Sequence, residues 1–375
     1  MGIDECETFG PYAFYLIGAR RKRELDFREI VDEKNWTEFS KFLETSDEVM
    51  EKDLEASMRK REELRKYLIE DKKLREQVKR PDAKILDWAG TTLFGGGVAA
   101  VDGTMNKFPM LTGVRCRIGV VATSYRNNSV ERVLYISERE FAEKVAPKAE
   151  EFYQLLAKGS GISNLFLQGI MSYKERAIAL SREEEWKFIH GTLVPLELRV
   201  PRIGHGAFEA SLELAKRLVE NKKCIGVISG SSEADFVGAG IVLEPGEYMF
   251  VAYAHNFVEE EMEEGVGNAD ERRILDDLAD QYLSKVKVGV FRVGPKPYLL
   301  EAHEEYFDQA AALVIADSMT QSLRGFPLLI DYADSMCKAL LSPDDFAQQI
   351  QHKMVTVGGI SGLGYEISER MLRRR

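Results

Sequence analysis

Hydrophobic spacing divides the chain into two parts that meet near Pro81. Residues 25–79 are charge-rich, almost free of Gly and Pro, and carry apolar side chains at helical intervals. Met50, Leu54 and Met58, for example, are four residues apart. Such spacing places side chains on one face of a helix. The segment therefore predicts one long helix or a helical hairpin that Pro81 ends.

Beyond Pro81, β-branched and apolar runs alternate with Gly-containing turns and with helical patterns. The runs at 95–104, 114–125 and 131–137 are closely spaced, which favours three antiparallel strands. We expect helices at 138–158, 164–185, 206–221, 304–322 and 344–354, strands at 186–191, 223–229, 248–254, 285–294 and 297–301, and a last strand turning into a helix at 326–334. Strands that open the run and then alternate with helices indicate an α/β or α+β fold, a mixed sheet covered by helices.

Composition places the 375-residue chain among ordinary globular proteins, because 45% of it is hydrophobic and 30% charged. It excludes disordered, collagen-like and disulfide-scaffold chains. The four cysteines lie far apart, with no zinc-ligand spacing. The first residues lack a basic segment followed by an apolar one, and no apolar run approaches the ~18 residues of a membrane span. We expect a cytoplasmic protein without membrane contact.

The net charge of −11 means that the molecule as a whole does not attract nucleic acid. Any such contact requires a local basic surface, or divalent metal held by acidic residues. The basic residues of 59–75 alternate with glutamates, which is typical either of a solvated helix face or of an arm that faces DNA or a partner. A second basic cluster lies at Arg20–Arg23.

Four polar residues are expected at or near the ends of strands. Asp102 follows the apolar run 98–101 and precedes Gly103, His190 ends a second run, Asp331 ends a third, and Asp334 falls in the first turn of the helix after it. Strand ends at one edge of a sheet are where α/β proteins build sites. Carboxylates and an imidazole suit Mn²⁺, and carboxylates suit Mg²⁺. The alternative for Asp102 is an Asp-Gly turn, and Asp334 can equally serve the helix dipole.

Glu175 lies in a predicted helix that leads into the strand of His190. Its neighbours Lys174 and Arg176 also fit a solvated glutamate on a helix surface. Nucleotide binding is poorly supported, because the Gly-rich segment at 95–97 lacks the Lys and Ser/Thr of a phosphate loop.

The order of motifs resembles the NurA nuclease family over about residues 90–350. The resemblance is carried by VAAVDGT, by LTGVRCRIGVVATSY, by a helical Glu before a strand-Gly-Thr-Leu element, and by the late GFPLLIDYAD. It implies a metal-dependent deoxyribonuclease with an RNase H-like core, working as a homodimer with the hexameric HerA ATPase in DNA end processing or phage defence. It also implies an N-terminal helical region at 1–81, a nuclease domain at 82–355 and a tail at 356–375.

Carried over residue by residue, the resemblance makes Asp102 the first acidic metal ligand and Glu175 the helical glutamate. Asp334 matches the late Ala-Asp pair, with Asp331 as an alternate ligand. His190 stands where the family has an acid, which shifts the expected preference from Mg²⁺ toward Mn²⁺.

A second departure lies after the strand 223–229, where Ser229 and Gly230 occupy the place of the family's usual lysine. Such a lysine would stabilise charge on the reacting phosphate. The two departures leave open a degenerate relative that serves as an assembly or regulatory partner of a ring ATPase. A metal-dependent hydrolase of small phosphate esters shares the same ligands.

Overall fold

The computed structural model describes residues 32, 34, 36, 39–110, 113–138, 140, 164–199, 207–230, 240–257 and 269–366. Most of the helix expected at 138–158 and the basic cluster Arg20–Arg23 lie outside these residues.

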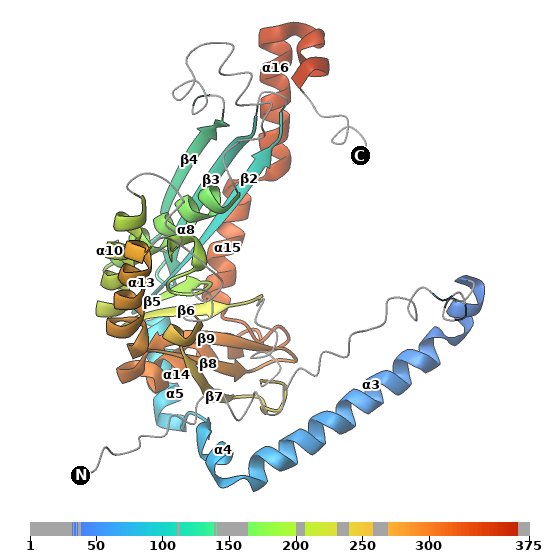
Figure 1. Cartoon of the computed structure of the whole chain (residues 1–375), viewed down its shortest axis with the longest axis vertical. Coiled ribbons are helices and arrows are strands. Elements are labelled where there is room, and N and C mark those ends of the chain that lie inside the picture. Colours follow the sequence, from blue (N-terminus) through green and yellow to red (C-terminus); the bar gives the residue numbers. More distant parts are fainter. Residues whose placement is uncertain are drawn as a thin grey trace.

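A nine-stranded mixed sheet forms the centre of the molecule (Figure 1), in the order β1-β7-β8-β9-β6-β5-β2-β3-β4. The strands are β1 (Val78–Lys79), β2 (Val98–Phe108), β3 (Arg115–Ser124), β4 (Val130–Ser137), β5 (Trp186–His190), β6 (Cys224–Ile228), β7 (Glu247–Tyr253), β8 (Val286–Arg292) and β9 (Pro297–His303). The pairs β2–β5 and β5–β6 are parallel, and the other neighbours are antiparallel. The prediction of a mixed sheet covered by helices is confirmed.

Helices cover both faces of the sheet. The helices of the described residues are α3 (Phe39–Glu70), α4 (Lys72–Gln77), α5 (Ala83–Phe94), α8 (Asn164–Ser181), α9 (Leu196–Arg199), α10 (Ala207–Glu220), α13 (Ala269–Gln281), α14 (Phe307–Met319), α15 (Leu328–Leu340) and α16 (Pro343–Glu366), with short 3₁₀ turns at Leu283–Lys285 and Glu304–Tyr306. Among the described residues, no helix is both long and apolar enough to cross a membrane.

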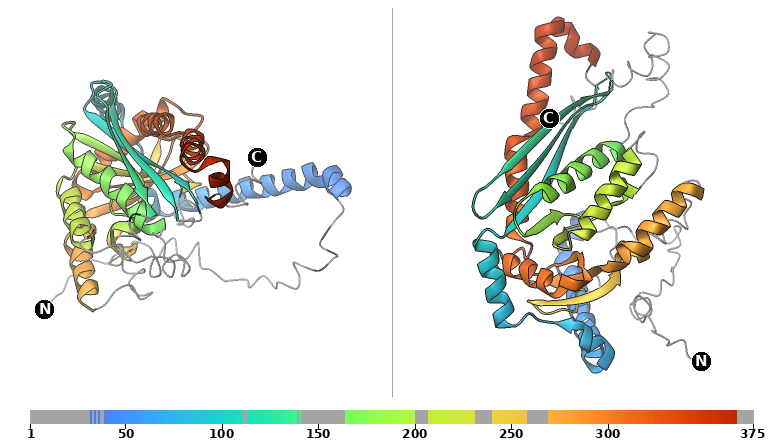
Figure 2. Two further views of the ribbon diagram at one scale, coloured as in Figure 1. Left: turned by 90° about the horizontal axis from the view of Figure 1, so that it is seen from above. Right: turned by 90° about the vertical axis from the view of Figure 1, so that its left-hand side faces the viewer.

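Alternation along the strands assigns side chains to the two faces. Val98 and Ala100 of β2 pack among residues of α5, α14 and α15. Val101, the residue after Ala100, packs on the other face with residues of α8, α10 and α13. The long strands β2, β3 and β4 run on beyond the short central strands toward α16, as Figure 2 also shows from two further sides. The central strands therefore end while β2 continues past them.

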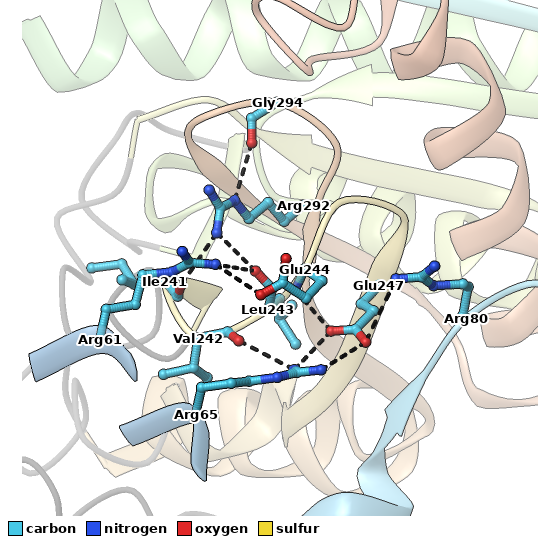
Figure 3. A network of polar contacts seen from close by, with 10 residues as sticks. All are labelled: Arg61, Arg65, Arg80, Ile241, Val242, Leu243, Glu244, Glu247, Arg292 and Gly294. Atoms are coloured by element: carbon cyan, nitrogen blue, oxygen red, sulfur yellow. Dashed lines mark hydrogen bonds and ion pairs between the residues drawn. The ribbon is translucent and has the colours of Figure 1, made fainter. Parts of the chain in front are cut away.

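Helix α3 leaves the body of the molecule and is anchored to it near its C-terminal end (Figure 1). Arg65 makes a two-pronged ion pair with Glu247, at 2.8 and 2.9 Å, and Arg61 Nε donates to the carbonyl of Ile241 at 2.7 Å (Figure 3). Bidentate arginine pairs hold a helix in a defined orientation. The part before the anchor exposes the apolar stripe of Met50, Leu54 and Met58, which are 52%, 64% and 64% exposed.

Two strand predictions need correction. Asp102 does not end its strand, because β2 continues to Phe108 and Asp102 pairs with Val121 of β3, so the turn interpretation of Asp-Gly is also wrong. The segment expected to be a strand at 326–331 is instead the start of α15. Asp331 thus lies in the first turn of a helix, and Asp334 is its seventh residue rather than part of the first turn.

Candidate functional site

Asp102 lies where β2 loses a neighbour. Residues Val98 to Val101 of β2 pair with β5, and Asp102 is the first residue beyond that pairing. It shares a face with Ala100, so its carboxylate is directed toward the side of α15. The residue is only 4% exposed. A strand held on both flanks up to this point fixes the acid at the edge of a buried region.

His190, the last residue of β5, contacts Asp102 directly. Its Nδ1 lies 2.9 Å from Asp102 Oδ1, and its ring packs edge-on against Phe326. Since an ionised carboxylate only accepts hydrogen bonds, Nδ1 carries the proton in this pair. Nε2 lies 2.8 Å from the hydroxyl of Ser229, just after β6. The imidazole is thus oriented from both sides.

Glu175 reaches the same region from α8, on the opposite face of the sheet. A Cβ on Gly103 would overlap the Glu175 carboxylate and lie 2.8 Å from Met171 Cγ. Because Gly103 has no side chain, Glu175 of α8 can lie close to β2. Glu175 is only 4% exposed and pairs with the buried guanidinium of Arg176. It is not the solvated surface residue that its charged neighbours also allowed.

The two acids of α15 behave differently. Asp334 pairs with Lys338 of the same helix, with Nζ 2.6 Å from Oδ2. Asp331 accepts from Gln321 Nε2 at 2.8 Å and from Arg324 Nη1 at 2.6 Å. Asp331 is therefore bound to the loop before α15, and the charge that acts on Asp102 and His190 from this helix is that of Asp334.

Electrostatics show that Asp102, Glu175, His190 and Asp334 form one group. Burial raises the pKa of Asp102; His190 offsets part of this rise, and the charge of Asp334 adds to it. Burial raises the pKa of Glu175 to about 7 although Arg176 opposes the shift, and the charge of Asp102 contributes. Burial lowers the pKa of His190, but its bond to Asp102 and the three acidic charges outweigh this, so the pKa rises. Burial is thus the largest cause of the raised pKa values of Asp102 and Glu175, and the neighbouring acids add to it.

The donors in this cluster suit Mn²⁺ or Mg²⁺, because three carboxylates and one imidazole are oxygen- and nitrogen-based ligands. In the structure, these four side chains do not surround a single point. Across the residues that the structure describes, no three acids, histidines or cysteines are grouped so as to hold an ion. The contacts explain this, since each acid has a partner of its own in His190, Arg176 or Lys338. The residues fit the metal by chemistry, and a bound ion would have to replace these partners.

Three further groups at the site were missed by sequence reasoning. Ser229 was noted only as a departure, yet it contacts His190. Lys296, in the turn between β8 and β9, donates to the Ser229 carbonyl at 3.0 Å, so a lysine does lie at the end of β6. Nothing near Ser229 in the sequence signals Lys296. Lys338 was detectable, because it follows Asp334 by four residues on a helix.

A cavity of about 630 Å³ lies elsewhere, between β3–β4 and the helices α8, α9 and α10. Its lining is mainly apolar and includes none of the four clustered residues. The cluster is the stronger candidate for catalytic chemistry, because it brings together ionisable groups with shifted pKa values.

Comparisons with known proteins found similarity only among solved structures. No protein-family model matches the chain, and no curated protein sequence does. Solved NurA nuclease structures are among its structural neighbours. The NurA nuclease from Sulfolobus solfataricus is 11% identical, with 85% of this chain and 97% of that chain covered and a TM-score of 0.48. NurA bound to dAMP and manganese is 9% identical, with 80% and 93% covered and a TM-score of 0.44.

An endonuclease V from Bacillus subtilis is a further neighbour, 13% identical, with 67% of this chain and 82% of that chain covered and a TM-score of 0.33. These names describe those proteins. The chemistry of this chain has to be argued from its own residues.

Proposed function

We propose that this chain is a divalent-metal-dependent nuclease that hydrolyses phosphodiester bonds of DNA, with Asp102, Glu175, His190 and Asp334 as the metal-binding residues. The observation that supports it is the convergence of these side chains from β2, α8, β5 and α15, with the pKa values of both Asp102 and Glu175 raised by burial. Burial disfavours the charged form of an acid, and a bound cation would offset that cost.

A bound Mn²⁺ or Mg²⁺ supplies an activated water and stabilises charge on the phosphate and the leaving oxygen. Asp102 is the most firmly positioned ligand, because β2 is paired on both flanks up to Val101 and His190 orients the carboxylate. Glu175 is held from the other face by Arg176. Asp331, engaged by two donors, is the alternate ligand on α15. The imidazole favours Mn²⁺ over Mg²⁺.

Three cations near this cluster support a phosphate-containing substrate. Lys296 lies in the β8–β9 turn, Arg324 in the loop before α15 and Lys338 near the end of α15, and all three are exposed. The charges of Asp102 and Arg324 both act on the ammonium group of Lys338. Local cations of this kind give an acidic protein a place to contact a DNA backbone.

We extend the proposal to partners. A homodimer and a HerA-type hexameric ATPase would use surfaces outside the site, and the exposed apolar stripe of α3 supports an association of this kind. DNA end processing or phage defence is the corresponding role. Light scattering of the purified chain tests the dimer, and co-purification with an ATPase encoded by a neighbouring gene tests the partner.

Cleavage of a linear duplex in Mn²⁺ tests the activity itself. Asp102→Asn keeps the side-chain volume and removes the ligand charge, so cleavage should fall by roughly 100-fold or more while the circular dichroism stays unchanged. Asp308→Asn, which changes an exposed acid of α14 that pairs with Lys79 outside the cluster, is the control and should retain activity. Full cleavage by the Asp102 variant would refute the assignment. Absence of cleavage by the wild type, with and without the ATPase, would favour the degenerate assembly partner instead.

The contacts of His190 favour a second candidate, a metal-independent serine hydrolase. A buried Asp102 on Nδ1 and Ser229 Oγ on Nε2 reproduce the order of contacts in a Ser-His-Asp triad. Ser229 would then be the nucleophile and His190 its general base. This enzyme would work in EDTA and lose activity in Ser229→Ala. The proposed nuclease would stop in EDTA and keep most of its activity in that variant.

A further inference from the structure

The ion pair between Lys338 and Asp334 lies at the rim of the cluster. Nζ of Lys338 is 2.6 Å from Oδ2 of Asp334, and the side chains are 65% and 22% exposed. The acid is therefore turned inward while most of the lysine is in solvent. An exposed pair of this type is weak, since its Coulomb energy is screened and its flexible lysine loses entropy. It can be replaced by a stronger cation.

The surroundings of Lys338 are charged on both sides. The hydrogen bond to Asp334 raises the pKa of Lys338, the charge of Asp102 adds to the rise, and the charge of Arg324 opposes it. The ammonium group therefore contacts Asp334 and is acted on by charges of both signs. Arg324 has its own acid, Asp331, which is also bound by Gln321. Two cations thus border the cluster, each neutralising one acid of α15.

We propose that Lys338 is a DNA-phosphate-binding residue that Asp334 holds while no metal ion is bound, and that a divalent ion on Asp334 releases it. The inference rests on the proposed function, because it requires Asp334 to be a ligand. A divalent ion on this carboxylate would repel an ammonium group in contact with the same carboxylate. The long lysine side chain can turn outward without moving α15. Metal loading and substrate contact are then linked through one residue.

Mn²⁺ binding without DNA, measured by calorimetry on the full chain, tests the first step. Lys338→Met removes the competing cation and keeps an unbranched side chain. Its dissociation constant for Mn²⁺ should be about 2- to 5-fold lower than that of the wild type, the range expected for loss of an exposed pair. The control is Lys222→Met, whose lysine pairs with Glu305 at the same 2.6 Å outside the site, with side chains 45% and 48% exposed. It should leave the affinity unchanged.

Arg324→Met decides between the two acids of α15. If Asp334 is the ligand, the Arg324 variant binds Mn²⁺ like the wild type and only Lys338→Met binds more tightly. If Arg324→Met tightens binding and Lys338→Met does not, Asp331 is the ligand and the proposal is overturned. Unchanged or weaker Mn²⁺ affinity in Lys338→Met also overturns it. If the wild type binds no Mn²⁺, the proposed function falls as well, so the two failures are distinguishable.

DNA binding tests the second step, with Ca²⁺ in place of Mn²⁺ and a duplex as the probe. The slope of log affinity against log salt should be smaller by about 0.9 in Lys338→Met, which is the loss of one phosphate contact. In EDTA, where Asp334 retains the lysine, the variant and the wild type should have equal slopes. An equal loss in Ca²⁺ and in EDTA would contradict the release of Lys338 by metal. No difference in either condition would contradict its contact with phosphate.

Discussion

Replacement of Asp317 by Asn should stabilise the protein at neutral pH. Asp317, on α14, is fully buried and supports the start of α15, the helix that carries Asp334. Its Oδ2 accepts the backbone N–H of Leu329 at 2.9 Å, and its Oδ1 accepts the hydroxyl of Tyr125. Burial raises its pKa from 3.8 to about 6, although both hydrogen bonds oppose the rise. The folded protein therefore prefers the neutral acid.

The magnitude follows from linkage. Between pH 3.8 and about 6 the folded chain holds a proton on Asp317 that the unfolded chain has lost, so the free energy of unfolding falls as the pH rises. Each pH unit of this interval corresponds to about 1.4 kcal/mol, which gives about 3 kcal/mol at pH 8. Asn is neutral at every pH. Its oxygen can accept from Leu329 and its amide can donate to Tyr125, so both contacts are retained.

Urea unfolding at several pH values measures this. Asp317→Asn should match the wild type near pH 4 and be more stable by about 3 kcal/mol at pH 8. Asp308→Asn is the control, because Tyr248 donates to Asp308 in the same way at 2.9 Å but the acid is 49% exposed. It should change stability by less than about 1 kcal/mol. A destabilised Asp317 variant at pH 8, or a difference independent of pH, would refute the reasoning.

Three further predictions concern the site and the arm. Cleavage should rise with pH through about 7, since the Glu175 carboxylate is needed in its charged form and burial raises its pKa to about that value; a flat profile between pH 6 and 8 would contradict this. Gly103→Ala should lower activity and cost about 1–3 kcal/mol in urea unfolding, because its Cβ would meet Glu175 and Met171. Arg65→Ala should speed proteolysis of α3 by removing the pair with Glu247, and an unchanged digestion pattern would show that other contacts anchor the helix.

Much of the fold was predictable because the spacing of apolar residues along the chain indicates which side chains are buried. Alternation in residues 114–125 and 131–137, with short connections, predicted the antiparallel strands β3 and β4. The helical spacing before Pro81 predicted one long helix or a hairpin that Pro81 ends. The long helix α3 confirms the helical character, but α3 ends at Glu70, and α4 and the strand β1 follow before Pro81. The direction in which α3 projects was not predictable, because it depends on contacts of Arg61 and Arg65 with residues about 180 positions away.

Both wrong strand assignments came from short sequence patterns that fit more than one local structure. Asp-Gly after an apolar run looks like a turn, but pairing of Asp102 with Val121 carries β2 straight through. The run before Asp331 is short and uniformly apolar, a pattern that fits a buried helix as well as a strand. In the structure, the carboxylate of Asp317 on α14 accepts the backbone N–H of Leu329 at the start of α15.

The sequence predicted which residue types make up the candidate site, but only partly how their side chains are arranged. Strand and helix positions were enough to suggest that Asp102, His190 and Asp334 approach one another. The partners that hold these groups now, such as Arg176 and Lys338, depend on side-chain orientation. Lys296 reaches the site from the β8–β9 turn, which only the order of strands brings near.

Anomalous diffraction from a Mn²⁺-soaked crystal tests the central claim most directly. We predict a manganese peak at ligating distance from Asp102 and from at least two of Glu175, His190 and Asp334, with the pairs to Arg176 or Lys338 opened. No peak beside Asp102, with its contact to His190 intact at saturating Mn²⁺, would contradict the assignment of this cluster as a metal site.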